Sequence, residues 1–569
     1  ARVRRGRQHV ATALLALGVL TAPGLAHAAS DDVVDRAVHA VVPLAPRMNA
    51  DAVETPKPKS RRAVSAPRNG TSAAARRETA RRRARATAAR RRSSRPARRA
   101  APLPALVATA PRGTTALAQD LATLMNARTT SGRWGALVVS LSRGDTLFAQ
   151  APGEPVTPAS TMKLFTAALA FDRLGPDHTF STDVLRDGAL APDGTLRGNL
   201  YIRGDGDPGF SDRFIRGGAN APVEVLAGMV AANGIRRITG DVVGDATAFE
   251  ARRIPDGWHA RNLGTYYAAP FSALSLNENL LVVAVSPGRA GQRATVRLEP
   301  ASRGVRLTGA VRTVRGARSR VVIRRVSDSE IAVTGTIGAS AGLRRWNAVV
   351  NDPARFTAGA LLAALERAGI EVAGSVRTGA APASAAPITG LSGPRVAQLV
   401  SVMNRESINH YAELLYRNAA RGRERQGIGS ADAAFLELQR FLRDRVRGDA
   451  AAVFATDGSG LSTLDRVTPR AMVQLLRYAH EAPWAGAFHA SLPVAGESDL
   501  LRHRMRYTAA QGNLHAKTGT LNDVVGLAGY VRALNGEMLA FSLVYNGSNG
   551  WGARESIDAM GATMAAWQR

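Results

Sequence analysis

Only four of the 75 basic side chains in this 569-residue chain are lysines, and two of these lysines stand where chemistry can be expected. The other 71 are arginines, so arginine is the cation that the sequence uses wherever positive charge alone is needed. An ammonium group is compact and can lose its proton, which a guanidinium does not do in proteins. Lys57 and Lys59 lie in a basic stretch, whereas Lys163 and Lys517 are isolated. Unless they survive by chance, these two lysines mark sites that need an ammonium group.

The first of them closes the motif Ser160-Thr161-Met162-Lys163. The spacing of apolar residues predicts a buried helix over 160–174, and residues three apart on a helix share a face, which places Lys163 Nζ beside Ser160 Oγ. A serine hydroxyl is a poor nucleophile unless a base removes its proton. A lysine can be that base when burial or neighbouring cations lower its pKa from about 10.4. Ser160 near the helix start also lies close to free backbone N–H groups.

A hydroxyl and an amide stand two residues apart in Ser407-Ile408-Asn409. Residues with this spacing do not share a helix face, so both can point into one cleft only from an irregular turn before the helix predicted at 409–420. Such a pair could relay a proton and position a substrate carbonyl.

The second isolated lysine opens Lys517-Thr518-Gly519-Thr520, in a predicted strand that leads to a C-terminal hairpin. Gly519 has no side chain, so a ligand backbone could approach closely. Lys517 and the Thr518 hydroxyl could hold a carboxylate through charge-assisted hydrogen bonds.

Each motif alone is a weak signal, but the three occur in order and contain both isolated lysines. The set resembles the Ser-x-x-Lys, Ser-x-Asn and Lys-Thr-Gly motifs of the penicillin-recognising serine enzymes. The 243 residues between Lys163 and Ser407 resemble the long gap of the class C low-molecular-mass penicillin-binding proteins, the D-alanyl-D-alanine carboxypeptidase/endopeptidase family. Ile408 departs from the Asp or Asn usual in that family, and its side chain is expected to point away from the cleft. The resemblance covers about residues 115–569 and includes 206–208, 274–279, 457–461 and 492–496, of which 206–208 and 457–461 are expected to be structural turns.

The resemblance implies a serine-type carboxypeptidase/endopeptidase that acts on peptidoglycan stem peptides through an acyl-enzyme. Ser160 would attack the carbonyl of the penultimate D-Ala, with Lys163 as general base. Ser407 would pass a proton towards the leaving amine, with Lys517 nearby. Asn409 would bond both to the general base and to the substrate amide.

Three further residues would bind the substrate in this scheme. Thr518 would hold the terminal carboxylate, and Gly519 lies between it and Thr520. The backbone N–H groups of Ser160 and Thr520 would form the oxyanion hole, which stabilises the charge that develops on the carbonyl oxygen. Neither a metal nor an organic cofactor is expected, and the implied partners are peptidoglycan peptides and β-lactams.

The implied fold is an α/β (α+β) transpeptidase/β-lactamase-like domain, with an antiparallel sheet flanked by helices. This domain would comprise 113–180 and 345–569. The β-rich insertion, one or two domains, would be 181–344, with a nested part near 207–283. Asn535-Gly536 between predicted strands at 525–534 and 537–545 is a strong hairpin signal. A second hairpin is predicted where apolar residues alternate over 134–142, Arg143-Gly144-Asp145 forms a turn and 146–150 returns.

The N-terminal residues indicate export. Four arginines, an apolar run and Ala26-His27-Ala28 are typical of a signal peptide over 1–28, which leads us to expect a periplasmic, cell-envelope or extracellular protein without a membrane span after cleavage. Residues 29–112 are predicted to be disordered. Within them, 57–99 hold 17 basic residues and one acidic residue, which could tether the chain to anionic envelope polymers or simply form a linker; nucleic acid is not expected as a partner.

Composition excludes some functions and leaves others open. The chain has no cysteine, so thiol catalysis and disulfide scaffolds are excluded. The ten histidines show no metal-binding spacing, and His410 and His515 beside the motifs are interpreted as satisfied or surface residues. A β-lactamase or esterase on the same scaffold, and a wall-binding protein without activity, are the alternatives to a peptidase.

Overall fold

The computed structural model describes residues 106–569, so the predicted signal peptide and the arginine-rich stretch 57–99 lie outside the described residues. Residues 106–112 were predicted to belong to the disordered segment, and this is wrong. Leu106 and Ala108 pack against a hydrophobic core, and the Thr109 backbone N–H donates to Thr563 Oγ1 (3.0 Å) on α12 (Gly550–Ala566). Within 106–569, no helix combines the length and the apolar character needed to cross a bilayer.

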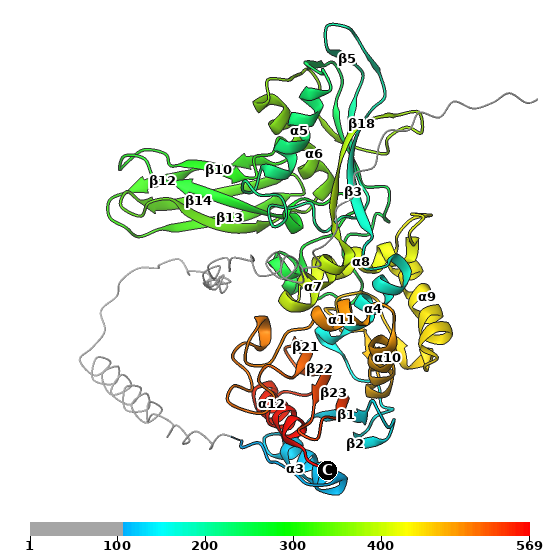
Figure 1. Cartoon of the computed structure of the whole chain (residues 1–569). Helices are drawn as coiled ribbons and strands as arrows, with labels where there is room; N and C mark the ends of the chain where they lie inside the picture. Colours follow the sequence, from blue (N-terminus) through cyan, green and yellow to red (C-terminus); the bar gives the residue numbers. More distant parts are fainter. Residues whose placement is uncertain (1–105) are drawn as a thin grey trace, which may run out of the picture. The chain divides into compact units, whose positions relative to one another are not determined.

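A five-stranded antiparallel sheet joins the two ends of the described chain (Figure 1). Its two hairpins, β1–β2 at one edge and β22–β23 in the interior of the sheet, are those predicted from sequence, and Gly536 in the second turn has φ 85°. The strand order is β2-β1-β23-β22-β21, so β21, which carries Lys517, is at an edge. The strands are β1 (Arg133–Ser140), β2 (Thr146–Gln150), β21 (His515–Leu521), β22 (Val524–Arg532) and β23 (Met538–Asn546).

Helices cover both faces of this sheet, as the predicted fold class requires. Alternate strand residues enter two different cores, because successive side chains of a strand point to opposite faces. Leu137 and Tyr530 belong to one core, and Val138 and Val531 belong to the other. The second core is closed by α12 and α3 (Thr114–Asn126). The first is closed by α4 (Lys163–Leu174), α7 (Val396–Glu406), α8 (Asn409–Arg421), α9 (Ala431–Phe441) and α10 (Pro469–Glu481), with α11 (Ala485–Ala490) beside them.

A second five-stranded sheet, with order β17-β8-β6-β3-β18, lies in the insertion. Two helices, α5 (Ala221–Ala232) and α6 (Pro353–Arg367), share its hydrophobic core. The sequence did not reveal α5 or the ten-residue strand β18, whose two prolines and two glycines are unusual in a strand. The strands are β3 (Thr179–Arg186), β6 (Leu200–Gly204), β8 (Val242–Asp245), β17 (Val376–Thr378) and β18 (Ala386–Arg395), with a small sheet of β4 (Ala189–Leu190), β5 (Thr195–Arg197), β7 (Arg237–Ile238) and β16 (Glu371–Val372).

Two further small sheets complete the insertion, and their strands contribute to the same hydrophobic core (Figure 1). The first has the order β10-β9-β15, from β9 (Leu280–Ser286), β10 (Thr295–Glu299) and β15 (Arg344–Val349). In the second, β14 pairs with β11 and β12 on one side and with β13 on the other. Its strands are β11 (Arg306–Thr308), β12 (Val311–Val314), β13 (Arg320–Ser327) and β14 (Glu330–Gly338).

The sheets do not divide at the predicted boundary between residues 344 and 345. Strand β18 pairs with β3, and α6 packs in the insertion's core, so residues up to 395 share structure with the insertion. The reason is that the chain enters the insertion through β3 and leaves it through β18, which pairs with β3.

Candidate active site

The segment that carries Ser160 is a tight turn rather than the first turn of one helix. A 3-10 helix (Ala159–Met162) precedes α4, and the Thr161 hydroxyl donates to the Pro158 carbonyl at 2.7 Å. Residues three apart eclipse one another in a 3-10 helix, and Lys163 Nζ lies 2.9 Å from Ser160 Oγ. The two side chains therefore lie side by side as predicted, although Ser160 is in a 3-10 helix and not in α4.

The Lys163 amine is buried among neutral oxygen atoms. Nζ donates to Asn409 Oδ1 at 2.6 Å and to the Ser459 carbonyl at 2.7 Å. No ion pair of Lys163 is present within residues 106–569. Burial lowers the pKa of Lys163 to about 7, even though the charges of Asp457, Glu413 and Asp465 act to raise it. A neutral amine has two N–H groups for its two carbonyl acceptors, which leaves its lone pair for the Ser160 hydroxyl.

Lys517 forms a second buried pair, with Ser407. Ser407 ends α7 with φ 60° and ψ 40°, the left-handed conformation, so the predicted irregular turn before α8 is confirmed. Lys517 Nζ donates to Ser407 Oγ and to the Thr518 carbonyl, both at 2.9 Å. Burial lowers the pKa of Lys517 well below its ordinary value, and the charge of Lys163 lowers it further.

Asn409 links the lysine to the insertion. It is the first residue of α8, and while its Oδ1 accepts from Lys163, its Nδ2 donates to the Tyr267 carbonyl at 2.7 Å. Ile408 packs against the hydrophobic core, consistent with the expectation that its side chain points away from the cleft.

The strand β21 lies against the turn that carries Ser160. Thr518 is buried, whereas Thr520 is exposed. A Cβ at Gly519 would lie 2.8 Å from the Pro158 carbonyl oxygen, so a side chain there would force the strand and the turn apart. From the sequence, Gly519 was expected to let a ligand backbone approach closely. The backbone that approaches it is instead the protein's own, at Pro158.

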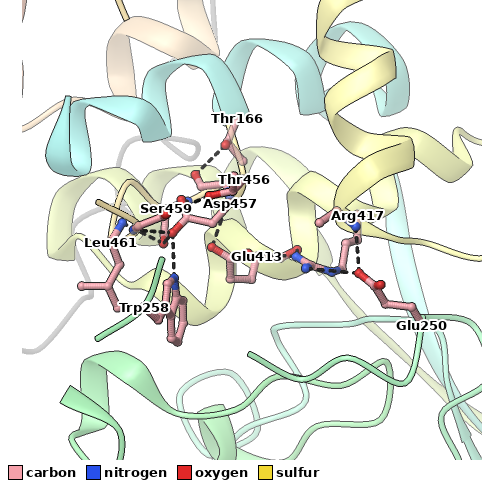
Figure 2. Close-up of polar contacts among 12 residues, drawn as sticks. Thr166, Glu250, Trp258, Glu413, Arg417, Thr456, Asp457, Ser459 and Leu461 are labelled. Atoms are coloured by element: carbon pink, nitrogen blue, oxygen red, sulfur yellow. Dashed lines mark hydrogen bonds and ion pairs between the residues drawn. The ribbon is translucent and has the colours of Figure 1, made fainter. Parts of the chain in front are cut away.

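Asp457 is a buried residue of this region whose importance the sequence did not reveal (Figure 2). It lies in the loop between β19 (Val453–Phe454) and β20 (Arg466–Val467). Its carboxylate accepts the backbone N–H groups of Ser459 (3.0 Å), Gly460 (2.6 Å) and Ser462 (2.8 Å). The indole N–H of Trp258, from the insertion, donates to the same carboxylate at 2.8 Å. These bonds fix the loop whose Ser459 carbonyl accepts from the lysine amine.

A buried ion pair supports the same loop from α8 (Figure 2). Glu413 accepts the Gly458 backbone N–H at 3.2 Å and an Arg417 N–H at 2.8 Å, and both side chains are fully buried. Arg417 also lies 3.9 Å above the Phe271 ring. Burial raises the pKa of Glu413 to about 7, and burial together with Asp457 raises that of Asp465 well above its ordinary value.

The histidines beside the motifs have different environments. His410 is buried, and neither of its ring nitrogens has a hydrogen-bond partner among residues 106–569, so the expectation of a satisfied or surface residue is wrong for it. Burial lowers the pKa of His410 to about 3, which leaves it neutral. His515 is only partly buried. In the part of the chain that the structure describes, no three potential ligands cluster so as to hold a metal ion.

A serine facing a buried lysine, a second serine–lysine pair and an asparagine between them, beside the edge strand of a helix-flanked sheet, define the class of active-site serine enzymes. The chain belongs to the D-Ala-D-Ala carboxypeptidase 3 (S13) family, whose sequence model matches residues 117–567.

Individual relatives agree with this assignment. The chain is 35% identical over 481 residues to the D-alanyl-D-alanine carboxypeptidase of Actinomadura sp. (strain R39), an alignment that covers 82% of this chain and 87% of the relative. It is 25% identical to the D-alanyl-D-alanine carboxypeptidase DacB of Haemophilus influenzae, over 68% of this chain and 80% of that protein. The fold is similar to the crystal structure of penicillin binding protein 4 from Haemophilus influenzae, with a TM-score of 0.65 at 21% identity, covering 77% of this chain and 98% of that one.

Replacement of Trp258 by Phe tests the support that the insertion gives to the loop. Trp258→Phe removes one hydrogen-bond donor from the buried Asp457 carboxylate. The free energy of unfolding should therefore fall by about 1.5–3 kcal/mol, and acylation by penicillin should become slower. Thermal unfolding and the second-order acylation rate are the measurements. Trp551→Phe is the matched control, because that indole is 74% exposed and donates to the partly exposed Glu555. If the two replacements changed unfolding and acylation equally, Trp258 would not support the loop that carries Asp457.

Proposed function

We propose that this chain is a serine-type D-Ala-D-Ala carboxypeptidase that removes the terminal D-Ala of peptidoglycan stem peptides through an acyl-enzyme. The observation that carries the proposal is the buried Lys163 amine, whose two N–H groups have carbonyl acceptors while Ser160 Oγ lies 2.9 Å away. The family and the printed names of the relatives support the substrate class.

Acylation begins with the transfer of the Ser160 hydroxyl proton to the neutral amine of Lys163. The oxygen attacks the carbonyl carbon of the penultimate D-Ala, and the negative charge moves to the carbonyl oxygen. The backbone N–H groups of Ser160 and Thr520 stabilise that charge, and each such donor is typically worth about 10²–10³ in rate. Collapse of the intermediate then breaks the C–N bond to the terminal D-Ala.

The leaving nitrogen takes up a proton as the bond breaks. Ser407 Oγ gives its proton to that nitrogen and regains the proton that Lys163 took from Ser160, while Lys517, whose Nζ lies 2.9 Å from Ser407 Oγ, stabilises the charge that develops there. Thr518 binds the terminal carboxylate beside the same lysine, and Asn409 holds the substrate amide. Water hydrolyses the acyl-enzyme and restores the Ser160 hydroxyl.

Several finer assignments belong to this proposal. The long segment between the first two motifs supports membership of the class C carboxypeptidase/endopeptidases, which would add cleavage of cross-links. The pairing of β18 with β3 supports an insertion of about 179–395 within a catalytic domain of 113–178 and 396–569. Location in the cell envelope follows from a peptidoglycan substrate.

Covalent labelling by a fluorescent penicillin tests the nucleophile. The strained ring mimics acyl-D-Ala-D-Ala, so the protein should become labelled, and Ser160→Ala should abolish the label. Ser142→Ala, at an exposed serine remote in sequence from the three motifs, is the control and should label normally. Persistent labelling of Ser160→Ala would exclude Ser160 as the nucleophile.

The pH dependence of acylation tests the general base. Lys163 accepts a proton only when it is neutral, so the second-order acylation rate should rise with pH through about 7 rather than through 10. The two lysines are coupled, so the observed midpoint belongs to the pair. Thermal unfolding at each pH controls for loss of structure. A flat profile between pH 5.5 and 8.5 would contradict an amine base.

Arginine replacements separate charge from proton transfer. A guanidinium keeps its proton, so Lys163→Arg should reduce acylation by about 10²–10⁴, the range for loss of general acid–base catalysis. Lys517→Arg should be milder, because charge is the chief requirement there. Acylation rates of both variants are compared at equal folded fraction. Near-normal acylation by Lys163→Arg, or equal losses in both variants, would mean that another base acts.

A further inference from the structure

The positive charge of the described chain is concentrated in one part of the insertion. Residues 106–569 carry a net charge of +13, and +10 of this belongs to residues 286–350, which hold 13 arginines and three acidic residues. All 13 arginine side chains are exposed. Three of them form ion pairs, namely Arg303, Arg306 and Arg345.

Strand register aligns several of the remaining arginines on one face. Ile331, Val333 and Ile337 of β14 point into the core, so Ala332, Thr334 and Thr336 point outward. Thr336 is opposite Arg312 of β12 on one side and opposite Arg320 of β13 on the other.

The row continues on both sides of β14. Arg293 is bridged to Arg312, so three arginines and one threonine cross the sheet in a line, and Arg324 lies opposite Ala332 on the same face. We call Arg293, Arg312, Arg320 and Arg324 the arginine face. None of the four forms an ion pair within residues 106–569. Arg293 and Arg312 are directly opposite one another, and like charges in such positions destabilise a sheet, so a bound anion would stabilise this row.

We propose that the arginine face binds a linear, phosphate-bearing polymer of the cell envelope. A guanidinium group can form a bidentate pair of hydrogen bonds with phosphate oxygens. The spacing of strands places Arg312 and Arg320 about 10 Å apart, on either side of the Thr336 hydroxyl. An extended polyanion could contact the whole row at once. Such binding would keep the enzyme at its insoluble substrate and goes beyond the catalytic proposal, which does not involve this face.

Two other partners fit the same surface less well. Among the described residues of 286–350, the large apolar side chains that are exposed are Val322, Val326 and Leu343, which offer little to insert into a lipid surface. The same stretch exposes no aromatic ring on which nucleic-acid bases could stack.

Chemical protection of arginines in the full chain tests the proposal without interference from the basic stretch 57–99. Phenylglyoxal modification is followed by mass spectrometry with and without long-chain inorganic polyphosphate. The arginine face should be protected, whereas the exposed control residues Arg236, Arg470 and Arg477 should react as before. Equal protection of both sets, or none, would overturn the proposal. Protection by phosphatidylglycerol vesicles or single-stranded DNA but not by polyphosphate would also overturn it.

A matched pair of triple variants gives a second measurement. Replacement of Arg293, Arg312 and Arg320 by Gln should reduce the slope of log affinity against log salt by about three, because each lost phosphate contact removes about one. Replacement of Arg236, Arg470 and Arg477 by Gln changes the net charge equally and should leave the slope unchanged. Penicillin acylation should be normal in both variants. Equal slopes in the two variants would contradict binding at the arginine face.

Discussion

The active site depends on the burial of two lysine amines, neither of which is bound by a carboxylate of residues 106–569. Moving an ammonium out of water is costly unless it is paired, so a buried lysine tends to lose its proton. Lys163 and Lys517 are both fully buried, and the charge of Lys163 adds to the effect on Lys517. Desolvation outweighs the nearby acidic groups at Lys163, which leaves its pKa at about 7, close to what a general base requires.

The fold provides neutral acceptors where ion pairs would have kept the lysine charged. The Ser459 carbonyl and the Asn409 amide oxygen each accept one N–H of Lys163. The loop that holds the first is fixed by Asp457, whose charge is satisfied by backbone N–H groups and by Trp258. The insertion therefore contributes to the active site through an indole and through the Tyr267 carbonyl, although it carries none of the three motifs.

The sequence was most informative where a local pattern decides the structure. The two hairpins follow from alternation and turn residues, and the Ser160–Lys163 contact follows from the spacing of the two residues. The irregular turn at Ser407 could also be predicted, because a helix cannot direct Ser407 and Asn409 to one side.

What the sequence could not reveal depends on contacts between distant segments. Every residue type has a backbone carbonyl, so the sequence could not show that the Ser459 carbonyl is the second acceptor of Lys163. The role of Gly519 became clear only when β21 was seen against the Pro158 turn. Strand β18 was not predicted because its prolines and glycines are unusual in a strand, and its pairing with β3 depends on a distant segment. Because β18 was missed, the boundary of the insertion was placed too early in the chain.

The most direct test of the central claim is a titration of the lysines themselves. The chain contains four lysines, so protein labelled with ¹³C at lysine Cε gives four signals, and Lys163→Arg and Lys517→Arg identify two of them. The account predicts that the Lys163 signal titrates near pH 7 and that the Lys517 signal also titrates well below the ordinary lysine pKa of about 10.4. A Lys163 signal that titrates near 10 would contradict the account.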